Sequence, residues 1–301
     1  MSDWGGYVVA EGNRKPSRVV ALGAALPTDF LFVGPLHTVD ADRGLRLNWG
    51  GSAPRFKADL NQGRRAAWYS LAFLLRSAAA EFLDVDPREF VAGVHPDWHP
   101  DADGKAYYAF LADSLENGAG FSTRLGEVFE DFAARAKRFL AGLADPGHAD
   151  TCQTSCHDCL RDYENMVLHP LLDWRLGADL FALLSGGELP NDHTAVARER
   201  RALDSVRSVL FGKFLLSDAA VIGAEVRGGV RYAIVARHPL EACEDSLTSP
   251  RLASALDAAL DYAADPSRVI ITDWFTAERN PLLVVQQTDP PARRKKKSVG
   301  G

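Results

Sequence analysis

Three cysteines and one histidine lie close together near the middle of the chain, in the order His148, Cys152, Cys156 and Cys159. A Cys-x-x-Cys spacing lets two thiolates bind the same tetrahedral ion, and zinc in structural sites is held by four sulfur or nitrogen ligands. The third thiol and the imidazole complete that number within one loop. The spacing therefore predicts a single structural Zn²⁺ ion bound by these four side chains.

The histidine is the predicted ligand with the most competitors. Asp150, His157 and His169 also lie near the cysteines. His157 stands between two cysteines, where its side chain tends to point away from a shared ion. His169 directly precedes a proline, and a histidine at such a position more often caps or packs. The spacing favours His148 as the fourth ligand, with Asp150 and His169 as alternatives.

The cysteines also allow a reading that involves no metal. A Cys-x-x-Cys pair can be a thioredoxin-like redox centre, but such a pair follows a strand within a βαβ unit. Here a long helical pattern precedes the pair, and a third cysteine lies beside it. Metal binding is therefore favoured over a redox pair or unremarkable thiols. Cys243, far along the chain, is expected to be a core thiol.

Helices are expected on both sides of the cysteine loop. Apolar residues recur every three or four positions over 64–83 and again over 125–143, which is the period of a buried helix face. After the cysteines, Pro170 is expected to open a helix that ends near Leu184, before Gly186-Gly187. Upstream, the runs 19–24, 29–34 and 44–49 predict strands, and the polar stretch 95–105 predicts a loop.

Beyond about residue 190 the pattern is that of a small α/β unit. It comprises a helix (195–208), three strands (209–216, 219–226, 230–236) with a hairpin at Arg227-Gly228-Gly229, a helix (250–263) and two strands (268–275, 282–287). The order is not a repeated βαβ, so the expected fold class is α+β. The expected parts are a β-rich N-terminal segment (1–62), a helical zinc-binding domain (63–187), a C-terminal α/β unit (194–288) and a basic disordered tail (289–301).

Charge and motifs exclude several functions. The net charge of −6 argues against a protein that coats nucleic acid through its overall field, and the basic run at 293–297 is expected to be a solvated tail. No GxxxxGK[ST] loop and no DExH run occurs, so no ATPase activity is expected by that mechanism. With no secretory signal and no apolar run of membrane-spanning length, the expected location is the cytoplasm, with no membrane partner.

Several stretches together resemble a known family. DSLENGAGFSTRL (113–125), the helix that follows it, and CQTSCHDCLRDYENMVLHPLLDWRLGADL (152–180) are similar to the zinc-binding domain at the C-terminal end of DEAD/DEAH-box-like helicases, named MZB after a mitomycin-repair helicase. The family includes helicase-associated phage-defence proteins such as the B component of DISARM. The resemblance covers roughly residues 20–185. Many members carry C-x-C-x3-C-x2-C, and Asp150 stands here at the first of those positions, which strengthens the case for His148.

The resemblance implies a non-catalytic, zinc-binding accessory subunit, or a detached C-terminal part, of an ATP-dependent helicase complex in DNA defence or repair. Its expected partners are a helicase motor subunit and DNA, single-stranded or duplex. The alternative is a metal-dependent nuclease with a degenerate restriction-endonuclease-like core, in which Asp218 and Glu225-Val226-Arg227 approximate the metal-binding acids. A scaffold that does not touch nucleic acid is a third reading.

Overall fold

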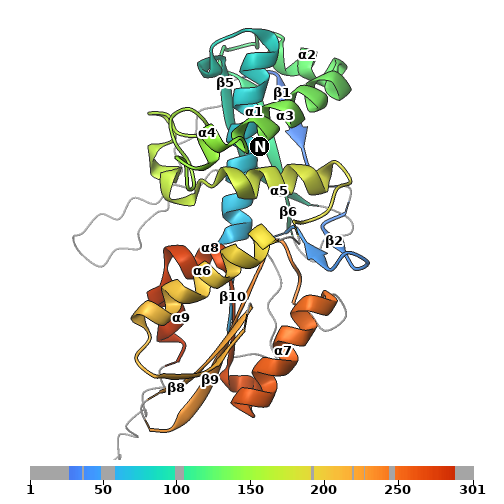
Figure 1. Ribbon diagram of the computed structural model, residues 1–301. Coiled ribbons are helices and arrows are strands. Elements are labelled where there is room, and N and C mark those ends of the chain that lie inside the picture. Colours follow the sequence, from blue (N-terminus) through green and yellow to red (C-terminus); the bar gives the residue numbers. More distant parts are fainter. Residues whose placement is uncertain are drawn as a thin grey trace, which may run out of the picture.

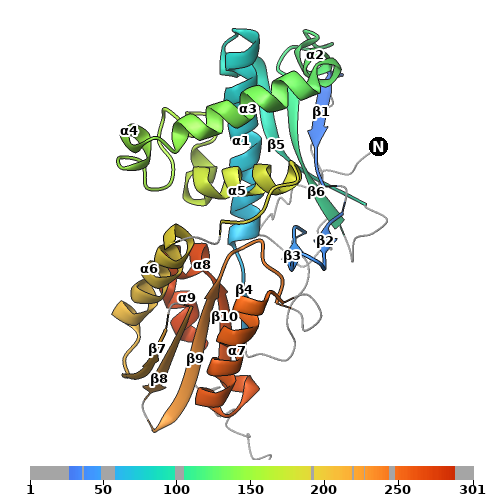
Figure 2. The ribbon, with the colours of Figure 1, turned by 45° about the vertical axis from the view of Figure 1, so that its right-hand side comes forward.

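The computed structural model describes residues 27–35, 37–48, 58–98, 105–190, 193–218, 220–226, 228–243 and 248–288. They form an upper unit around helix α1 and a lower unit around a five-stranded sheet (Figures 1 and 2). Helices and strands are mixed without a repeated βαβ order, which confirms the α+β class. The expected strand at 19–24 and the tail at 289–301 lie outside the described residues.

Helix α1 (Gly63–Leu83) is the centre of the upper unit. It is buried on nearly all sides, whereas the sequence pattern predicted one apolar face. A helix that is apolar all round belongs to the interior. Helix α5 (Trp174–Leu184) crosses it at Gly177, where a Cβ atom would lie 3.0 Å from the Leu71 backbone nitrogen. Glycine at this position therefore lets the two helices approach closely.

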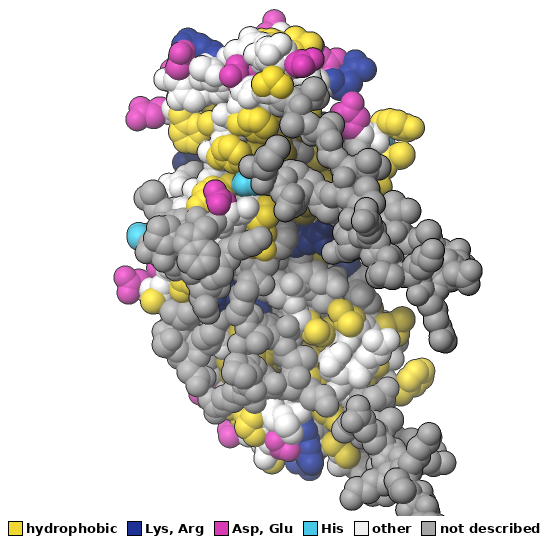
Figure 3. Space-filling model, turned by 180° about the vertical axis from the view of Figure 1, so that it is seen from behind, with side chains coloured by type: hydrophobic (Ala, Val, Ile, Leu, Met, Phe, Trp, Pro, Cys, Tyr) yellow, Lys and Arg dark blue, Asp and Glu magenta, His cyan; other side chains and the backbone are white. Residues whose placement is uncertain are grey.

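A three-stranded antiparallel sheet packs against α1. It contains β1 (Phe30–Val33), β6 (Lys105–Asp113) and β5 (Phe90–Trp98), in that order. Strand β1 confirms the strand expected at 29–34, but β5 extends into the stretch expected to be a loop from residue 95. Phe30 and Phe32 are about half exposed on the outer face, and Figure 3 shows hydrophobic side chains over the upper part of that side of the molecule.

The helix predicted over 125–143 is two helices, α2 (Phe121–Glu127) and α3 (Phe129–Leu143), with a break at Val128. The turn before α2 is organised by Asp113, whose carboxylate accepts hydrogen bonds from the backbone N–H groups of Ala119 and Ser122 at 2.7 and 2.8 Å. Burial acts to raise the pKa of Asp113, but hydrogen bonds led by those of Ser122 outweigh it and hold the pKa below its usual value. This carboxylate therefore holds the turn before α2.

The lower unit is a mixed sheet in the order β4-β10-β9-β8-β7, with helices on both faces. One core cluster lies under α7, while α6, α8 and α9 cover the other face. Strand β10 runs parallel to β4 and β9, and β7, β8 and β9 are antiparallel neighbours. The elements are β4 (Ala58–Leu60), α6 (His193–Val209), β7 (Lys213–Ser217), β8 (Val221–Val226), β9 (Val230–Arg237), α7 (Pro250–Ala263), β10 (Val269–Asp273), α8 (Trp274–Arg279) and α9 (Pro281–Gln286).

Two predictions about helices, one in each unit, are wrong. The apolar run 282–287 was expected to be a strand, but it is helix α9, which begins at Pro281 and buries Val284. A short apolar run fits either structure, and proline in the first helical turn favours the helix. Pro170 lies inside a short 3₁₀ helix (Met166–Leu171) and does not open α5, which begins at Trp174 after the capping residue Asp173.

Polar contacts join the two units at the start of α1. The buried Arg64 side chain donates hydrogen bonds to the carbonyl oxygens of Pro239 and Glu241 at 3.0 and 2.9 Å. From α5, the carboxylate of Asp179 accepts a hydrogen bond from Nε2 of His238 at 3.1 Å. Strand β4, which precedes α1 directly, belongs to the lower sheet. Remaining short elements are β2 (Val39–Asp40), β3 (Leu45–Arg46), α4 (Pro146–Ala149) and the 3₁₀ helices Pro87–Glu89 and Pro266–Arg268.

No helix of the described residues is long and apolar enough to cross a membrane.

Candidate metal centre

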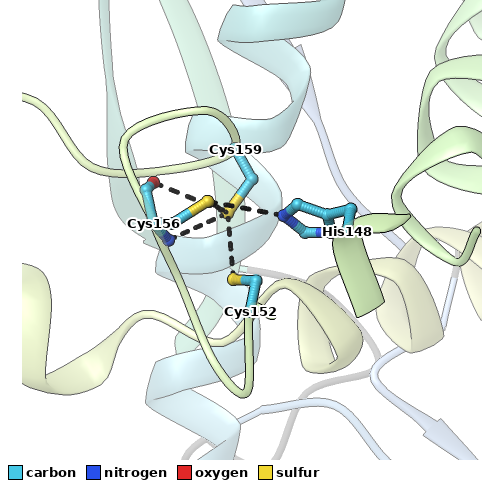
Figure 4. A group of neighbouring side chains, drawn as sticks. All are labelled: His148, Cys152, Cys156 and Cys159. Atoms are coloured by element: carbon cyan, nitrogen blue, oxygen red, sulfur yellow. Dashed lines mark hydrogen bonds between the residues drawn. The ribbon is translucent and has the colours of Figure 1, made fainter. Parts of the chain in front are cut away.

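The loop between α3 and α5 brings the four predicted ligands together (Figure 4). His148 lies on the short helix α4, Cys152 follows that helix, and Cys156 and Cys159 lie on the next turn. Their ligand atoms all lie within 4.8 Å of one another. Among the described residues this is the one group of three or more His, Cys, Asp or Glu side chains with such a geometry.

The distances between these atoms fit a tetrahedral zinc site. Sγ of Cys159 lies 3.8 Å from Sγ of Cys152 and 3.6 Å from Sγ of Cys156, and Nε2 of His148 lies 3.5 Å from Sγ of Cys156. With Zn–S bonds of ~2.3 Å and a Zn–N bond of ~2.0 Å, a tetrahedron has S–S edges of ~3.8 Å and S–N edges of ~3.5 Å. These three separations therefore match the edges of a tetrahedron around one Zn²⁺ ion.

The imidazole of His148 is oriented by its other nitrogen. Nδ1 lies 2.8 Å from the carbonyl oxygen of Leu143, so a proton on Nδ1 is donated to that oxygen. This tautomer leaves the lone pair of Nε2 directed at the sulfur atoms. The ring also meets the Trp174 ring edge-on, with 5.4 Å between centroids. Both contacts fix the histidine in the orientation that a ligand needs.

The electrostatics of the cysteines favour a metal over redox chemistry. Burial raises the pKa of the Cys152 and Cys159 thiols above the usual value. A reactive redox cysteine needs the opposite shift, towards the thiolate. A bound cation offsets the burial penalty on the thiolate directly. Two buried thiols without an ion would therefore remain neutral, and with Zn²⁺ they become ligands.

The competing ligands lie elsewhere. Asp150 and His157 are exposed and outside the cluster. Nε2 of His169 lies 2.8 Å from Oδ1 of Asn165, and Asn165 in turn donates a hydrogen bond to the Leu160 carbonyl. His169 is therefore a packing residue, as its position before proline suggested. Cys243 is buried in the core under α7.

Two residues that the sequence analysis missed hold the loop in place. The Arg175 guanidinium donates hydrogen bonds to the carbonyl oxygens of Gln153, Cys152 and Ala149 at 2.6, 3.1 and 3.1 Å. It stacks over Trp174, whose Nε1–H also donates to the Cys152 carbonyl. Both residues begin α5, so the helix start is bonded to the loop backbone. No sequence pattern around Trp174 and Arg175 predicts that they bond to the metal loop.

The predicted nuclease residues do not come together. Asp218 follows β7 and pairs through its backbone with Val221, at the start of β8. Glu225 lies four residues further along β8, opposite Lys213, which separates the two acids by ~13 Å along the strand. Arg227 lies outside the described residues. Among the described residues, these acids belong to no group that could hold a metal ion.

The fold and the site thus define an α+β protein with a helical zinc-binding module. Residues 71–160 match the family model of the MZB domain, described as the MrfA Zn-binding domain. This confirms the family resemblance and zinc as the cofactor. A stretch of 126 residues, 41% of the chain, is 33% identical to the Druantia protein DruE of Escherichia coli (strain UMEA 4076-1). The chain covers 6% of that relative, so the shared stretch is a small part of a much longer protein. No solved structure matches the chain.

Proposed function

We propose that the chain is a non-catalytic accessory subunit, or a detached C-terminal part, of an ATP-dependent helicase complex that acts in DNA defence or repair. In this proposal His148, Cys152, Cys156 and Cys159 bind one Zn²⁺ ion, and all four coordination positions are filled by protein. A closed site of this kind stabilises a fold and leaves no position for a reactive water. The zinc ion therefore shapes a docking module and takes no part in bond cleavage.

The observation that carries the proposal is the coincidence of the site with the family match. The four ligand atoms lie in one cluster, and all four of their residues fall within the matched segment. The similarity to the Druantia protein DruE supports the same proposal. The same proposal includes the four parts of the chain, 1–62, 63–187, 194–288 and 289–301, and a cytoplasmic location.

Native co-purification tests this role. The tagged chain, expressed from its own promoter, should enrich a polypeptide with helicase ATPase motifs, and the Cys156→Ser variant should enrich much less of it. The purified chain alone should show no ATP turnover above background, because its sequence lacks the loop that cradles phosphate. Turnover that follows the chain through successive columns, or a complex without any motor protein, contradicts the proposal.

A further inference from the structure

Helix α6 concentrates positive charge in a chain whose net charge is −6. Its arginines are Arg198, Arg200, Arg201 and Arg207. Arg198 pairs with Asp179 on α5, and Arg201 lies 3.5 Å from Glu278 on α8. The helix lies along the outer side of the lower unit (Figures 1 and 2). Two of its arginines are thus used in packing, and two remain to be explained.

Those two, Arg200 and Arg207, line adjoining hollows on this side of the molecule. One hollow, of about 270 Å³, is lined by Arg200, Asp204, Arg207, Ser217 and Asp218. The other, of about 570 Å³, extends towards the start of the helix and is lined by His193, Val196 and Arg200. They share Arg200 and Asp204. Together they form one groove along α6, called here the α6 groove.

The guanidinium of Arg207 is held in place in this groove. It donates a hydrogen bond to Oγ of Ser217 at 2.7 Å and lies 5.2 Å above the Phe214 ring. Its Nε is buried and has no hydrogen-bond partner. Asp204 lies 3.5 Å away, which is a weak ion pair. A guanidinium fixed in this way, whose Nη1 makes only this weak contact, is suited to an anionic ligand.

Arg200 supplies a second cation at a useful distance. It is exposed, and no ion pair or hydrogen bond to it is found among the described residues. It precedes Arg207 by seven residues, which places the two on one face of the helix ~10 Å apart along its axis. A single phosphate does not span that distance, but successive phosphates of a nucleic-acid strand do. Of the two acids of the groove, Asp218 lies in the hollow that contains Arg207, and Asp204 lies between the two arginines.

We propose that the α6 groove binds the phosphodiester backbone of a nucleic acid through Arg200 and Arg207. The inference rests on the proposed function, because it supplies the nucleic-acid contact of the helicase complex. Guanidinium groups bind phosphate in a bidentate manner, and backbone contacts give affinity without sequence preference. Among the described residues no Phe, Tyr or Trp side chain lines either hollow, so the groove is suited to backbone contacts more than to stacking on bases.

The test is a salt titration of DNA binding by the full zinc-loaded chain. Fluorescence anisotropy of a labelled single strand and of the matching duplex is measured for the wild type, Arg200→Glu and the double variant Arg200→Glu/Arg207→Gln. Each lost phosphate contact should lower the salt-dependence slope by about one and weaken binding at 50 mM salt by about tenfold. Exposed Arg138 on α3 gives the matched control, since Arg138→Glu changes the net charge equally.

The controls separate the outcomes. Zinc content and melting temperature equal to the wild type show that a variant is folded. Arg138→Glu should stay within about twofold of the wild type, and an equal loss in this variant overturns the groove. If millimolar inorganic phosphate displaces the labelled DNA as well as unlabelled DNA does, the groove is a small-anion site, and this result also contradicts the proposal. If a motor protein co-purifies but DNA does not bind, the groove fails and the accessory role stands. If DNA binds through the groove but no motor co-purifies, the accessory role fails.

Discussion

At the scale of single residues, the cysteine cluster joins two buried thiols, Cys152 and Cys159, to more exposed neighbours. Cys156 is half-buried, and Asp150 and His157 beside the cluster are exposed. We expect the ion to contribute strongly to the order of the loop, because zinc binding in small zinc peptides is worth on the order of 10 kcal/mol. That exceeds the whole stability of many domains. Each ligand is consequently expected to matter more than an ordinary core residue.

Replacing one thiolate should remove the metal. The wild-type chain should contain about one zinc ion, and Cys156→Ser should contain close to none, because a serine hydroxyl does not replace a thiolate ligand. Elemental analysis of protein purified under reducing conditions measures this. Cys243→Ser is the control, since it removes a thiol that lies in another core cluster. Full zinc content in Cys156→Ser would refute the assignment.

The fourth ligand can be identified by comparing two histidines. His148→Ala should weaken zinc affinity by more than about tenfold, a loss seen even when outer partners of metal ligands are changed. His169→Ala should leave the affinity unchanged, because its imidazole bonds to Asn165 and not to the cysteines. Competition with a chromophoric chelator gives both constants. Equal losses in the two variants would argue against His148.

At the scale of elements, the start of α5 is the mechanical support of the metal loop. Three loop carbonyls accept hydrogen bonds from the single guanidinium of Arg175. Arg175→Lys keeps the charge but lacks the planar fork that reaches all three, so the two cations are not equivalent here. We expect this variant to lose zinc to a chelator about tenfold faster than the wild type. Stopped-flow release measures the rate, and Arg138→Lys, which should not change it, is the control.

The N-cap of the same helix predicts a pH dependence. Burial raises the pKa of Asp173 to about 6, although its carboxylate accepts a hydrogen bond from the Arg175 backbone. A carboxyl whose pKa is higher in the folded state stabilises the fold at low pH. That stability is lost as the pH rises from about 4 to about 6, and the loss is on the order of 2–3 kcal/mol.

Asp173→Asn isolates this group, because asparagine caps a helix as well as aspartate and does not titrate. The free energy of unfolding of wild type minus variant should fall by 2–3 kcal/mol, on the order of the Asp173 shift, between pH 4 and pH 7. Protonation of the zinc ligands affects both proteins equally and cancels in the difference. Denaturant titrations across this range measure it. A difference that does not change with pH would show that Asp173 has an ordinary pKa.

The comparison of sequence and structure is clearest for these elements. The ligand cluster could be predicted because its ligand types and spacing are local, and α1 because its apolar pattern is long. The break at Val128 and the role of Arg175 could not, since both depend on contacts made only after folding. The run 282–287 was misread because its four apolar residues fit a strand or a helix equally. The pairing of β4 with β10 joins residues some 200 apart, which no local pattern reveals.

At the scale of the whole molecule, the two units share one core. A single cluster of buried residues runs from Cys152 and Cys159 through α1 to Trp274 and Ile270 in the lower unit. The start of α1 is bonded to the lower unit as well, since the backbone N–H of Gln62 donates to the carboxylate of Asp273 at 3.1 Å. The second core cluster, under α7, is separate from the metal loop. Zinc binding should therefore stabilise the face of the lower sheet covered by α6 and α8 more than the face covered by α7.

Zinc removal should consequently lower hydrogen-exchange protection outside the metal loop as well. After chelation, backbone amides of α1 and α5 should lose hydrogen-exchange protection most, followed by those of α6 and α8, which share the continuous core. Helix α7, packed on the separate core, should keep most of its protection. Hydrogen–deuterium exchange with peptide resolution measures all of these in one experiment, with re-addition of zinc as the control for reversibility. If chelation changes exchange only within residues 144–175, the metal stabilises its own loop alone, and the shared core does not couple the two units.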